Sequence, residues 1–205
     1  MYNSRMSSKP VPTTRHLDLG CGDKPRNPYQ RDELHGIDIF PRHEPGKYEI
    51  RKANLALEAI PYPDAYFDSV SAYDFLEHVP RVLMTADASS TRFPFIELMN
   101  EIWRVLKPGG LLYASTPLYP HAAVFQDPTH VNFLTIESHI YFTQPKLLAR
   151  MYGFAGDFSV KRVMPLSPRF DYEPQNASWT HTLRKWNRAR RNANSHVLWE
   201  FIANK

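Results

Sequence analysis

The sequence predicts an open α/β fold whose strands run mainly parallel. Three observations lead to this prediction. Strand-like and helix-like patterns alternate through the first half of the chain, a glycine turn directly follows the first strand, and a helical pattern ends at Pro108-Gly109-Gly110 before another strand begins. Such alternation is typical of parallel sheets joined by crossovers.

The first half contains five candidate strands and one clear helix. The strands are expected at Arg15–Leu19, Leu34–Ile39, Tyr48–Arg51 (the weakest pattern), Phe67–Tyr73 and Leu111–Ser115. Apolar residues at helical spacing predict the helix, namely Phe95, Leu98, Met99, Ile102, Val105 and Leu106. These elements are expected to form the half that binds a ligand.

The second half is less regular. Residues 119–135 form a long loop, which is predicted to contact the substrate because loops of this length are commonly functional. A helix is expected over Ile136–Tyr152, ending near Gly153, and strands over Phe158–Met164 and His196–Ala203. Between these strands, a candidate helix carries Trp179, Leu183 and Trp186 on one face.

Composition sets the class of protein. The 205 residues are 42% hydrophobic and 22% charged, which is ordinary globular usage and excludes coiled coil and wholesale disorder. No apolar run is long enough for a membrane span, and a single cysteine, Cys21, fits a reducing compartment. We expect a flexible tail at 1–14 and one domain at 15–205, located in the cytoplasm or at the surface of the inner membrane.

The glycine turn indicates a bound ligand. Gly20 and Gly22 follow the first strand, where the absence of a Cβ lets the backbone approach a ligand closely. Asp38 ends the second strand eighteen residues after Gly20, near the spacing at which an acidic residue binds ribose hydroxyls. The third glycine of a dinucleotide fingerprint is replaced by Pro25, so the pattern favours an adenosine ligand without phosphates and disfavours NAD.

Five blocks in this order resemble the class I S-adenosylmethionine-dependent methyltransferases, of the type 11-like kind. They are Leu17-Asp18-Leu19-Gly20-Cys21-Gly22, Gly36-Ile37-Asp38, residues 60–70, Asp74-Phe75-Leu76-Glu77-His78-Val79 and Arg104-Val105-Leu106-Lys107-Pro108-Gly109-Gly110. The resemblance covers residues 15–118, the cofactor half, and leaves 119–205 for the substrate side. It implies a Rossmann-like fold, with helices on both faces of the sheet and an antiparallel last strand at His196–Ala203.

The resemblance also implies a cofactor site for S-adenosylmethionine. Gly20, Cys21 and Gly22 would pass under the methionine part, which Asp18 orients, and Asp38 with the adjacent Ile39 would hold the ribose and neighbouring groups. Asn54 and Leu55 stand beside the adenine, and Asp74 faces the reactive end.

Two departures from the family pattern concern the first crossover. Lys24 stands where many members have a further glycine, and only fourteen residues, Asp23 to Gly36, separate the turn from the second strand. The first crossover helix is therefore expected to be short or irregular.

Methyl transfer to a hydroxyl requires a base, because the neutral oxygen is a poor nucleophile. His130 in the long loop is the preferred base, with Asp127 either orienting its imidazole or joining it on a metal. Two ligands do not complete a metal site, so none is predicted. His78 lies one helical turn after Asp74 and is the alternative base, or else only a helix-stabilising residue.

The basic stretch Arg184–Arg191 has three interpretations. It is a solvated helix face, a contact for an anionic acceptor or acidic membrane surface, or a contact for RNA phosphates. No RNA-binding module precedes the core, which disfavours nucleic acid as the partner.

The predicted acceptor is a hydroxyl of a sugar or glycan, because the compact cofactor motif and the Asp-Pro-Thr-His loop are similar to methyltransferases of bacterial surface-polysaccharide pathways. Three alternatives stay open: a methyltransferase of a quinone or natural product, an RNA methyltransferase, and a binding module without enzyme activity. The sequence leaves the oligomeric state open.

Overall fold

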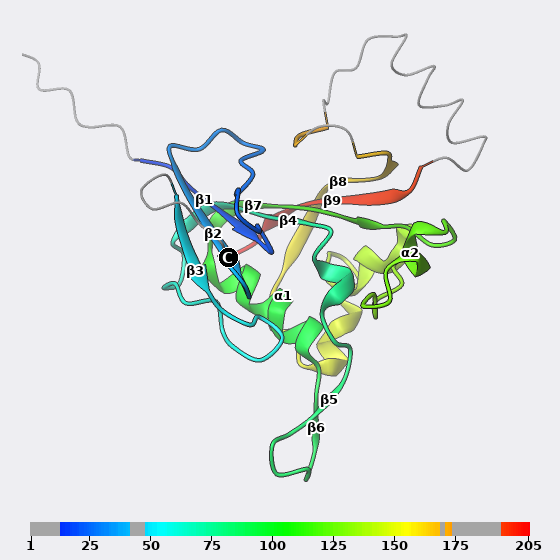
Figure 1. Cartoon of the computed structure of the whole chain (residues 1–205). Helices are drawn as coiled ribbons and strands as arrows, with labels where there is room; N and C mark the ends of the chain where they lie inside the picture. Colours follow the sequence, from blue (N-terminus) through cyan, green and yellow to red (C-terminus); the bar gives the residue numbers. More distant parts are fainter. Residues whose placement is uncertain (1–12, 42–47, 169–170, 174–193) are drawn as a thin grey trace, which may run out of the picture.

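The computed structural model describes residues 13–41, 48–168, 171–173 and 194–205. Its centre is a seven-stranded sheet in the order β3-β2-β1-β4-β7-β9-β8 (Figure 1). The strands are β1 (Arg15–Leu19), β2 (Glu33–Asp38), β3 (Glu49–Lys52), β4 (Phe67–Tyr73), β7 (Leu106–Pro117), β8 (Phe158–Leu166) and β9 (His196–Ala203). The five strands from β3 to β7 pair in parallel, whereas β9 is antiparallel to both of its neighbours.

This topology confirms the predicted sheet with its antiparallel last strand. The bounds of β1, β4 and β9 are those expected from the sequence, and β2 and β3 are each displaced by one residue. Strand β7 begins at Leu106 rather than Leu111, because the chain leaves the helix directly into the strand and continues through Gly109 and Gly110.

One face of the sheet carries the main apolar core. Alternate residues of the strands, such as Leu17 and Leu19 of β1 and Trp199 and Phe201 of β9, point to this face. Helix α1 (Pro94–Val105) packs against them through the apolar stripe predicted from its 3.6-residue spacing. Pro94 occupies the first turn, where its missing N–H costs no hydrogen bond.

The opposite face is more polar and is covered by coil. Tyr29, from the irregular crossover between β1 and β2, donates a hydrogen bond to the buried Glu200 of β9 and packs edge-on against Tyr113. The short or irregular crossover is thus confirmed. Within the described residues, α1 and the 3₁₀ helices lie on the other face (Figure 1), so coil stands here in place of the expected helix layer.

The long helix predicted at Ile136–Tyr152 is wrong. Two 3₁₀ helices occupy the segment, η2 (Ile136–Tyr141) and η3 (Leu148–Tyr152), because Pro145 cannot continue a helix from the preceding turn. The predicted end is correct, since Gly153 terminates η3 with a left-handed backbone. The candidate helix with Trp179, Leu183, Trp186 and Arg184–Arg191 lies outside the described residues.

Three small elements complete the described chain. These are η1 (Leu76–His78) after β4, α2 (Ala123–Gln126) after β7, and a protruding hairpin of β5 (Leu83–Met84) and β6 (Thr91–Arg92). Across the ranges that the structure describes, no helix is both long and apolar enough to span a membrane.

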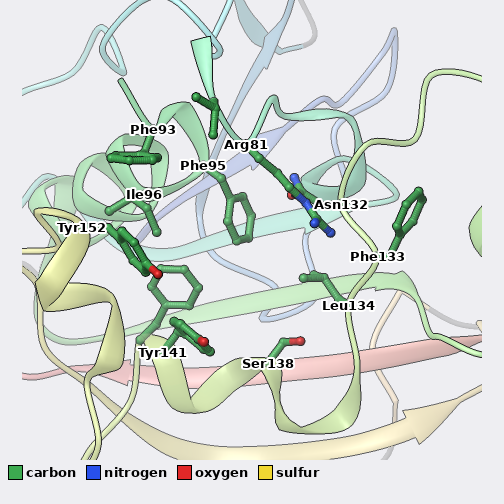
Figure 2. A pocket seen from close by; sticks show the side chains of 12 residues that line it. Arg81, Phe93, Phe95, Ile96, Asn132, Phe133, Leu134, Ser138, Tyr141 and Tyr152 are labelled. Atoms are coloured by element: carbon green, nitrogen blue, oxygen red, sulfur yellow. The ribbon is translucent and has the colours of Figure 1, made fainter. Parts of the chain in front are cut away.

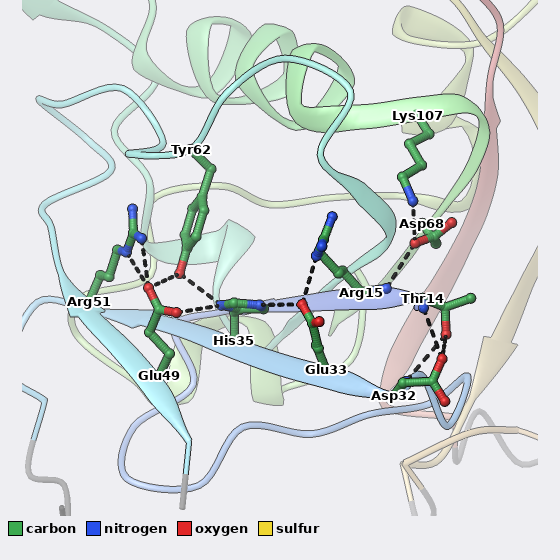
Figure 3. Close-up of polar contacts among 10 residues, drawn as sticks. All are labelled: Thr14, Arg15, Asp32, Glu33, His35, Glu49, Arg51, Tyr62, Asp68 and Lys107. Atoms are coloured by element: carbon green, nitrogen blue, oxygen red, sulfur yellow. Dashed lines mark hydrogen bonds and ion pairs between the residues drawn. The ribbon is translucent and has the colours of Figure 1, made fainter. Parts of the chain in front are cut away.

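The amino ends of the strands are held by ion pairs (Figure 3). Arg15 pairs with Glu33, Lys107 pairs with Asp68, and His35 lies 3.2 Å from Glu49. These charges are paired with one another at the edge opposite the carboxyl ends of the parallel strands, which leaves the carboxyl edge as the place for a ligand.

Candidate functional site

The carboxyl ends of the parallel strands bring the predicted cofactor residues to one edge of the sheet. Gly20 follows β1, Asp38 ends β2 and Asp74 follows β4, and these strands are neighbours in the order β2-β1-β4. Between β1 and β4 the chain connections diverge to opposite sides, which is the switch point where ligands of open α/β sheets bind.

The turn after β1 requires its glycines. Gly20 has φ +65°, and a Cβ there would lie 2.5 Å from the Phe75 ring. Gly22 has φ +58°, and a Cβ there would meet nothing within 4 Å. The left-handed backbone at both positions favours glycine, and the open space above Gly22 leaves room for a ligand to approach the chain.

Asp38 is fixed beside this turn. Its Oδ2 accepts a hydrogen bond from the N–H of Gly22 at 2.9 Å, and its Oδ1 accepts one from the N–H of Phe40 at 2.8 Å. Each carboxylate oxygen can accept a further bond, so Asp38 remains able to accept from two hydroxyls of a ribose. Ile39 beside it is 41% exposed and offers an apolar surface at the same edge.

Asp18 lies beneath the turn in the buried polar face. Its Oδ2 accepts from the N–H of Arg26 at 2.8 Å, and its Oδ1 accepts from the hydroxyl of Ser71 at 2.6 Å. Burial outweighs these bonds and raises the pKa of Asp18 to about 7. The side chain therefore supports the turn from below and is close to its titration point at neutral pH.

Cys21 and Leu55 serve packing through their side chains. A Cβ on Gly36 would lie 2.5 Å from Sγ of Cys21, so the thiol fills the space that Gly36 leaves. Burial raises the pKa of the Cys21 thiol to about 12, which keeps it protonated. Leu55 is buried in the main core, and the neighbouring Asn54 accepts the N–H of Ala56 with its side-chain oxygen, which leaves its NH₂ group available.

A cleft of about 370 Å³ opens beyond the ends of β4 and β7. Its lining includes Asp74, Glu77, Asp127, His130 and His196. Asp74 has a left-handed backbone, φ +48°, and its Oδ1 lies 2.8 Å from Nε2 of His196. The cleft therefore adjoins the cofactor edge through Asp74.

Glu77 is the most deeply buried acid of the cleft. It is 1% exposed, and its Oε2 accepts a hydrogen bond from the hydroxyl of Thr116 at 2.9 Å. Its Oε1 has no hydrogen-bond partner. Burial raises the pKa of Glu77 to about 7.

His130 faces Glu77 across the cleft. The loop is held there because the N–H groups of Val131 and Asn132 both donate to the backbone carbonyl of Glu77. Nδ1 of His130 lies 3.0 Å from the carbonyl oxygen of Val124, and Nε2 lies 3.9 Å from Oε1 of Glu77. A carbonyl only accepts, so Nδ1 donates to it, and Nε2 is the nitrogen that faces the cleft and that a neutral ring leaves unprotonated.

The structure brings His78 to the same place. Its ring centroid lies 4.8 Å from that of His130, edge to face, and its Nδ1 lies 2.8 Å from Oγ1 of Thr129. Burial and the neighbouring His130 lower the pKa of His78. The two histidines predicted as alternative bases therefore belong to one cluster.

The carboxylate of Asp127 is bound by Thr129 and not by the imidazole of His130. Oδ1 of Asp127 accepts from both the N–H and the hydroxyl of Thr129, at 2.8 and 2.7 Å. This local turn is a common use of aspartate in loops, and it satisfies the carboxylate close to its own backbone. The ring of His130 is oriented by Val124 instead, and Asp127 stays at the rim of the cleft.

A second cavity of about 450 Å³ lies on the α1 side of the loop (Figure 2). Aromatic and aliphatic side chains form most of its wall, including Phe93, Phe95, Leu134 and Tyr141, and Arg81 with Asn132 supplies the polar part. The loop at 119–135 thus contributes to both cavities.

Glu77 and His196 were not assigned a role from the sequence. Glu77 lies in the block Asp74-Phe75-Leu76-Glu77-His78-Val79. An acidic residue beside a histidine, shortly after a strand, is the signal that could have identified it as a site residue. His196 begins the last strand, and an antiparallel strand beside β7 starts at the carboxyl edge of the parallel ones. Strand direction was therefore sufficient to place His196 at the site.

The fold and this site define a class of protein. A family model described as a methyltransferase domain matches residues 3–200, so the chain belongs to the methyltransferase-domain family. This membership confirms the predicted class and S-adenosylmethionine as its cofactor. No curated protein matches the chain.

Solved structures agree on the fold. The chain is similar to the putative methyltransferase of Haloferax volcanii solved with the Trm112 activator, at 14% identity and a TM-score of 0.56, over 94% of this chain and 84% of that one. The chain is also similar to an S-adenosylmethionine-dependent methyltransferase from Mesorhizobium loti, at 14% identity and a TM-score of 0.55, over 94% of this chain and 93% of that one. It is similar to a further S-adenosylmethionine-dependent methyltransferase, from Archaeoglobus fulgidus, at 17% identity and a TM-score of 0.51, over 94% of this chain and 86% of that one.

Proposed function

We propose that the protein transfers a methyl group from S-adenosylmethionine to a hydroxyl oxygen of a sugar or glycan. One observation carries the proposal: the glycine turn with Asp38 and the cleft with an unprotonated imidazole lie at the same edge of the sheet, joined by Asp74. The bound cofactor supplies an electrophilic methyl group on a sulfonium, so the chain has to position the acceptor and remove its proton.

The cofactor-side roles follow from the geometry of the turn. Gly20, Cys21 and Gly22 provide a backbone surface without obstructing side chains, and Asp38 accepts from the ribose hydroxyls. Ile39 and Asn54 border the adenine, Asn54 through its available NH₂ group. Asp74 faces the cleft and separates the two halves of the site.

His130 activates the acceptor. Its Nε2 is unprotonated when the ring is neutral, and the Val124 carbonyl fixes the orientation of that ring. A base in this position removes the proton as the oxygen–carbon bond forms, which typically contributes about 10²- to 10⁴-fold in rate. His78 lies against His130 and holds the same region of the cleft through Thr129.

The polar rim of the cleft favours a polyhydroxyl acceptor. Asp74 and Asp127 are exposed carboxylates on its lining and can accept hydrogen bonds from sugar hydroxyls. An acceptor with an anionic group would use the basic residues Arg184–Arg191, and a lipid-linked one would place the protein at the inner face of the cytoplasmic membrane. We assign the protein to the cytoplasm on the same grounds.

The second cavity favours an alternative acceptor, a small apolar metabolite such as a quinone. Its aromatic wall suits a ring system that the polar cleft would not hold (Figure 2).

Methyl-labelled S-adenosylmethionine distinguishes the two acceptor classes. The protein is incubated with lipid-linked and free glycans in one series and with apolar phenols in the other. We expect label in the glycan products as a base-stable ether. Label in the phenols alone would replace the proposed acceptor by the alternative, and label in neither series would contradict both.

A further inference from the structure

Two side chains of the cleft, Glu77 and His130, lie close to a third, His78. One carboxylate oxygen of Glu77 and one imidazole nitrogen each of His78 and His130 all lie within 4.8 Å of one another. Glu77 and His78 come from η1, which follows β4, while His130 comes from a loop 53 residues further along the chain than Glu77. The topology, not a local sequence motif, therefore brings the set together.

The hydrogen bonds fix which nitrogens are free. His130 donates from Nδ1 to the Val124 carbonyl, so its Nε2 carries a lone pair. The hydroxyl of Thr129 donates to Asp127, so Oγ1 of Thr129 accepts from Nδ1 of His78. His78 therefore also presents an unprotonated Nε2. These proton positions follow from the partners of each ring.

Glu77 completes the set with an unsatisfied atom. The residue is 1% exposed, and Oε1 has no hydrogen-bond donor although it lies 3.9 Å from Nε2 of His130. A carboxylate oxygen and an imidazole lone pair facing each other in a buried place repel, and a buried polar atom without a partner is costly. A cation between them removes both penalties.

We infer that Glu77, His78 and His130 bind a divalent transition-metal ion, of the class of Zn²⁺, Mn²⁺ or Fe²⁺. Two imidazoles and one carboxylate are the ligands such ions prefer, whereas Mg²⁺ and Ca²⁺ favour all-oxygen sites. Bonds of about 2.0–2.2 Å to a tetrahedral ion place ligand atoms about 3.3–3.6 Å apart, so separations of up to 4.8 Å need to shorten by at most about 1.5 Å.

Each of the three ligands already has an outer partner. Thr116 donates to Oε2 of Glu77, the Val124 carbonyl holds His130, and the Thr129–Asp127 pair holds His78. Outer partners of this kind orient the ligands of metal sites and fix the tautomers of the histidines. Their presence on all three side chains distinguishes this cluster from a chance gathering of surface residues.

Three protein ligands leave a coordination position open toward the cleft, as in catalytic metal sites. Resting on the proposed function, this position takes the acceptor hydroxyl, whose pKa falls on the ion. The proton leaves to solvent, the oxygen–carbon bond forms as the carbon–sulfur bond of the sulfonium breaks, and S-adenosylhomocysteine departs. His130 then activates the acceptor through the ion it holds.

The test measures metal binding without turnover. Chelator-stripped protein is titrated with Zn²⁺ and with Mn²⁺ by calorimetry, and Co²⁺ is added as a spectroscopic probe of the ligands. We expect one ion per chain, and a loss of affinity of about 100-fold or more in Glu77→Gln, His78→Ala and His130→Ala. Thr116→Val should weaken binding by about 10- to 100-fold through Glu77 alone.

His139→Ala is the matched control. His139 bonds through Nδ1 to the Ile136 carbonyl within η2 and does not line the cleft, so its loss should leave metal affinity unchanged. Equal affinity in wild type and His130→Ala, with both variants folded by circular dichroism, would overturn the inference. Since Glu77→Gln removes a buried group, the His78 and His130 variants keep the test valid should that variant misfold.

Failure of the inference and failure of the proposed function give different results. Metal binding without S-adenosylmethionine binding would uphold the metal site and contradict the proposed transfer. Full methyl transfer by metal-free protein in excess chelator would uphold the proposed function and overturn the role of the ion in activating the acceptor.

Discussion

The two halves of the site are built in different ways. On the cofactor side, Gly20, Gly22 and Asp38 lie at the ends of adjacent parallel strands, and the backbone contributes as much as the side chains. On the acceptor side, the groups come from four separate segments: η1, the end of β7, the loop around His130 and the start of β9. The first half is a local motif, whereas the second depends on the tertiary structure.

Because of this difference, mutations in the two halves should affect cofactor binding and methyl transfer separately. Changes at the glycine turn and Asp38 should weaken the cofactor, and changes in the His130 cluster should slow transfer with the cofactor still bound.

His130→Ala should lower the rate of methyl transfer by about 10²- to 10⁴-fold while leaving S-adenosylmethionine affinity within a factor of two. The imidazole touches the cleft and none of the turn residues, so only activation is lost. Single-turnover rates and calorimetry measure the two quantities, with His139→Ala as the unaffected control. A parallel loss of cofactor affinity would contradict the separation of cofactor binding from acceptor activation.

Asp38→Ala should weaken S-adenosylmethionine binding by about 1.5–3 kcal/mol, since hydrogen bonds to a charged group are worth that much. The variant also frees the N–H groups of Gly22 and Phe40. Asp38→Asn keeps a hydrogen-bond acceptor and should therefore lose less S-adenosylmethionine affinity than Asp38→Ala. Unchanged affinity of the alanine variant in calorimetry would remove Asp38 from the cofactor site.

Asp18→Asn should change how stability depends on pH. The folded pKa is about 7 against an ordinary value of 3.8, so between these pH values the folded chain holds a proton that the unfolded chain has released. The stability contributed by Asp18 is therefore full well below pH 3.8 and falls as pH rises to 7.

Relative to wild type, the Asp18→Asn variant should gain about 2–3 kcal/mol in free energy of unfolding between pH 5 and pH 8. Urea melts of the cofactor-free protein at both pH values measure the difference. An equal stability difference at both pH values would mean that Asp18 is already ionised in the folded protein at pH 5.

Gly20→Ala should destabilise the protein by about 1 kcal/mol more than Gly22→Ala. Both positions have positive φ, so both variants pay for the left-handed backbone. Only at Gly20 does the new Cβ also collide with a ring, that of Phe75 at 2.5 Å. The difference in stability between the two variants, measured by thermal melts, gives the cost of the contact with Phe75. Equal losses of stability would show that the Phe75 ring moves aside at no cost in free energy.

Much of the sheet could be predicted from the sequence because its strands carry short, local patterns. Leu17 and Leu19 alternate with His16 and Asp18, and the structure buries the two sets on opposite faces. The glycine turn could be predicted for the same reason, since φ at Gly20 depends on its immediate neighbours.

The acceptor side could be predicted only in part, because its contacts join distant residues. His78 and His130 were recognised separately, but their meeting depends on the backbone bonds from the loop to Glu77. Asp127 was assigned to His130 by sequence proximity, and the local turn with Thr129 satisfied its carboxylate first. The helix at Ile136–Tyr152 failed because its apolar spacing outweighed Pro145 in the prediction.

Calorimetric titration with S-adenosylmethionine, S-adenosylhomocysteine and NAD tests whether the glycine turn and Asp38 form the methyl-donor site. We predict micromolar binding of the first two at one site per chain, weakened together in Asp38→Ala, and no binding of NAD. Binding of NAD, or of none of the three, would contradict the assignment of the glycine turn and Asp38 as a methyl-donor site.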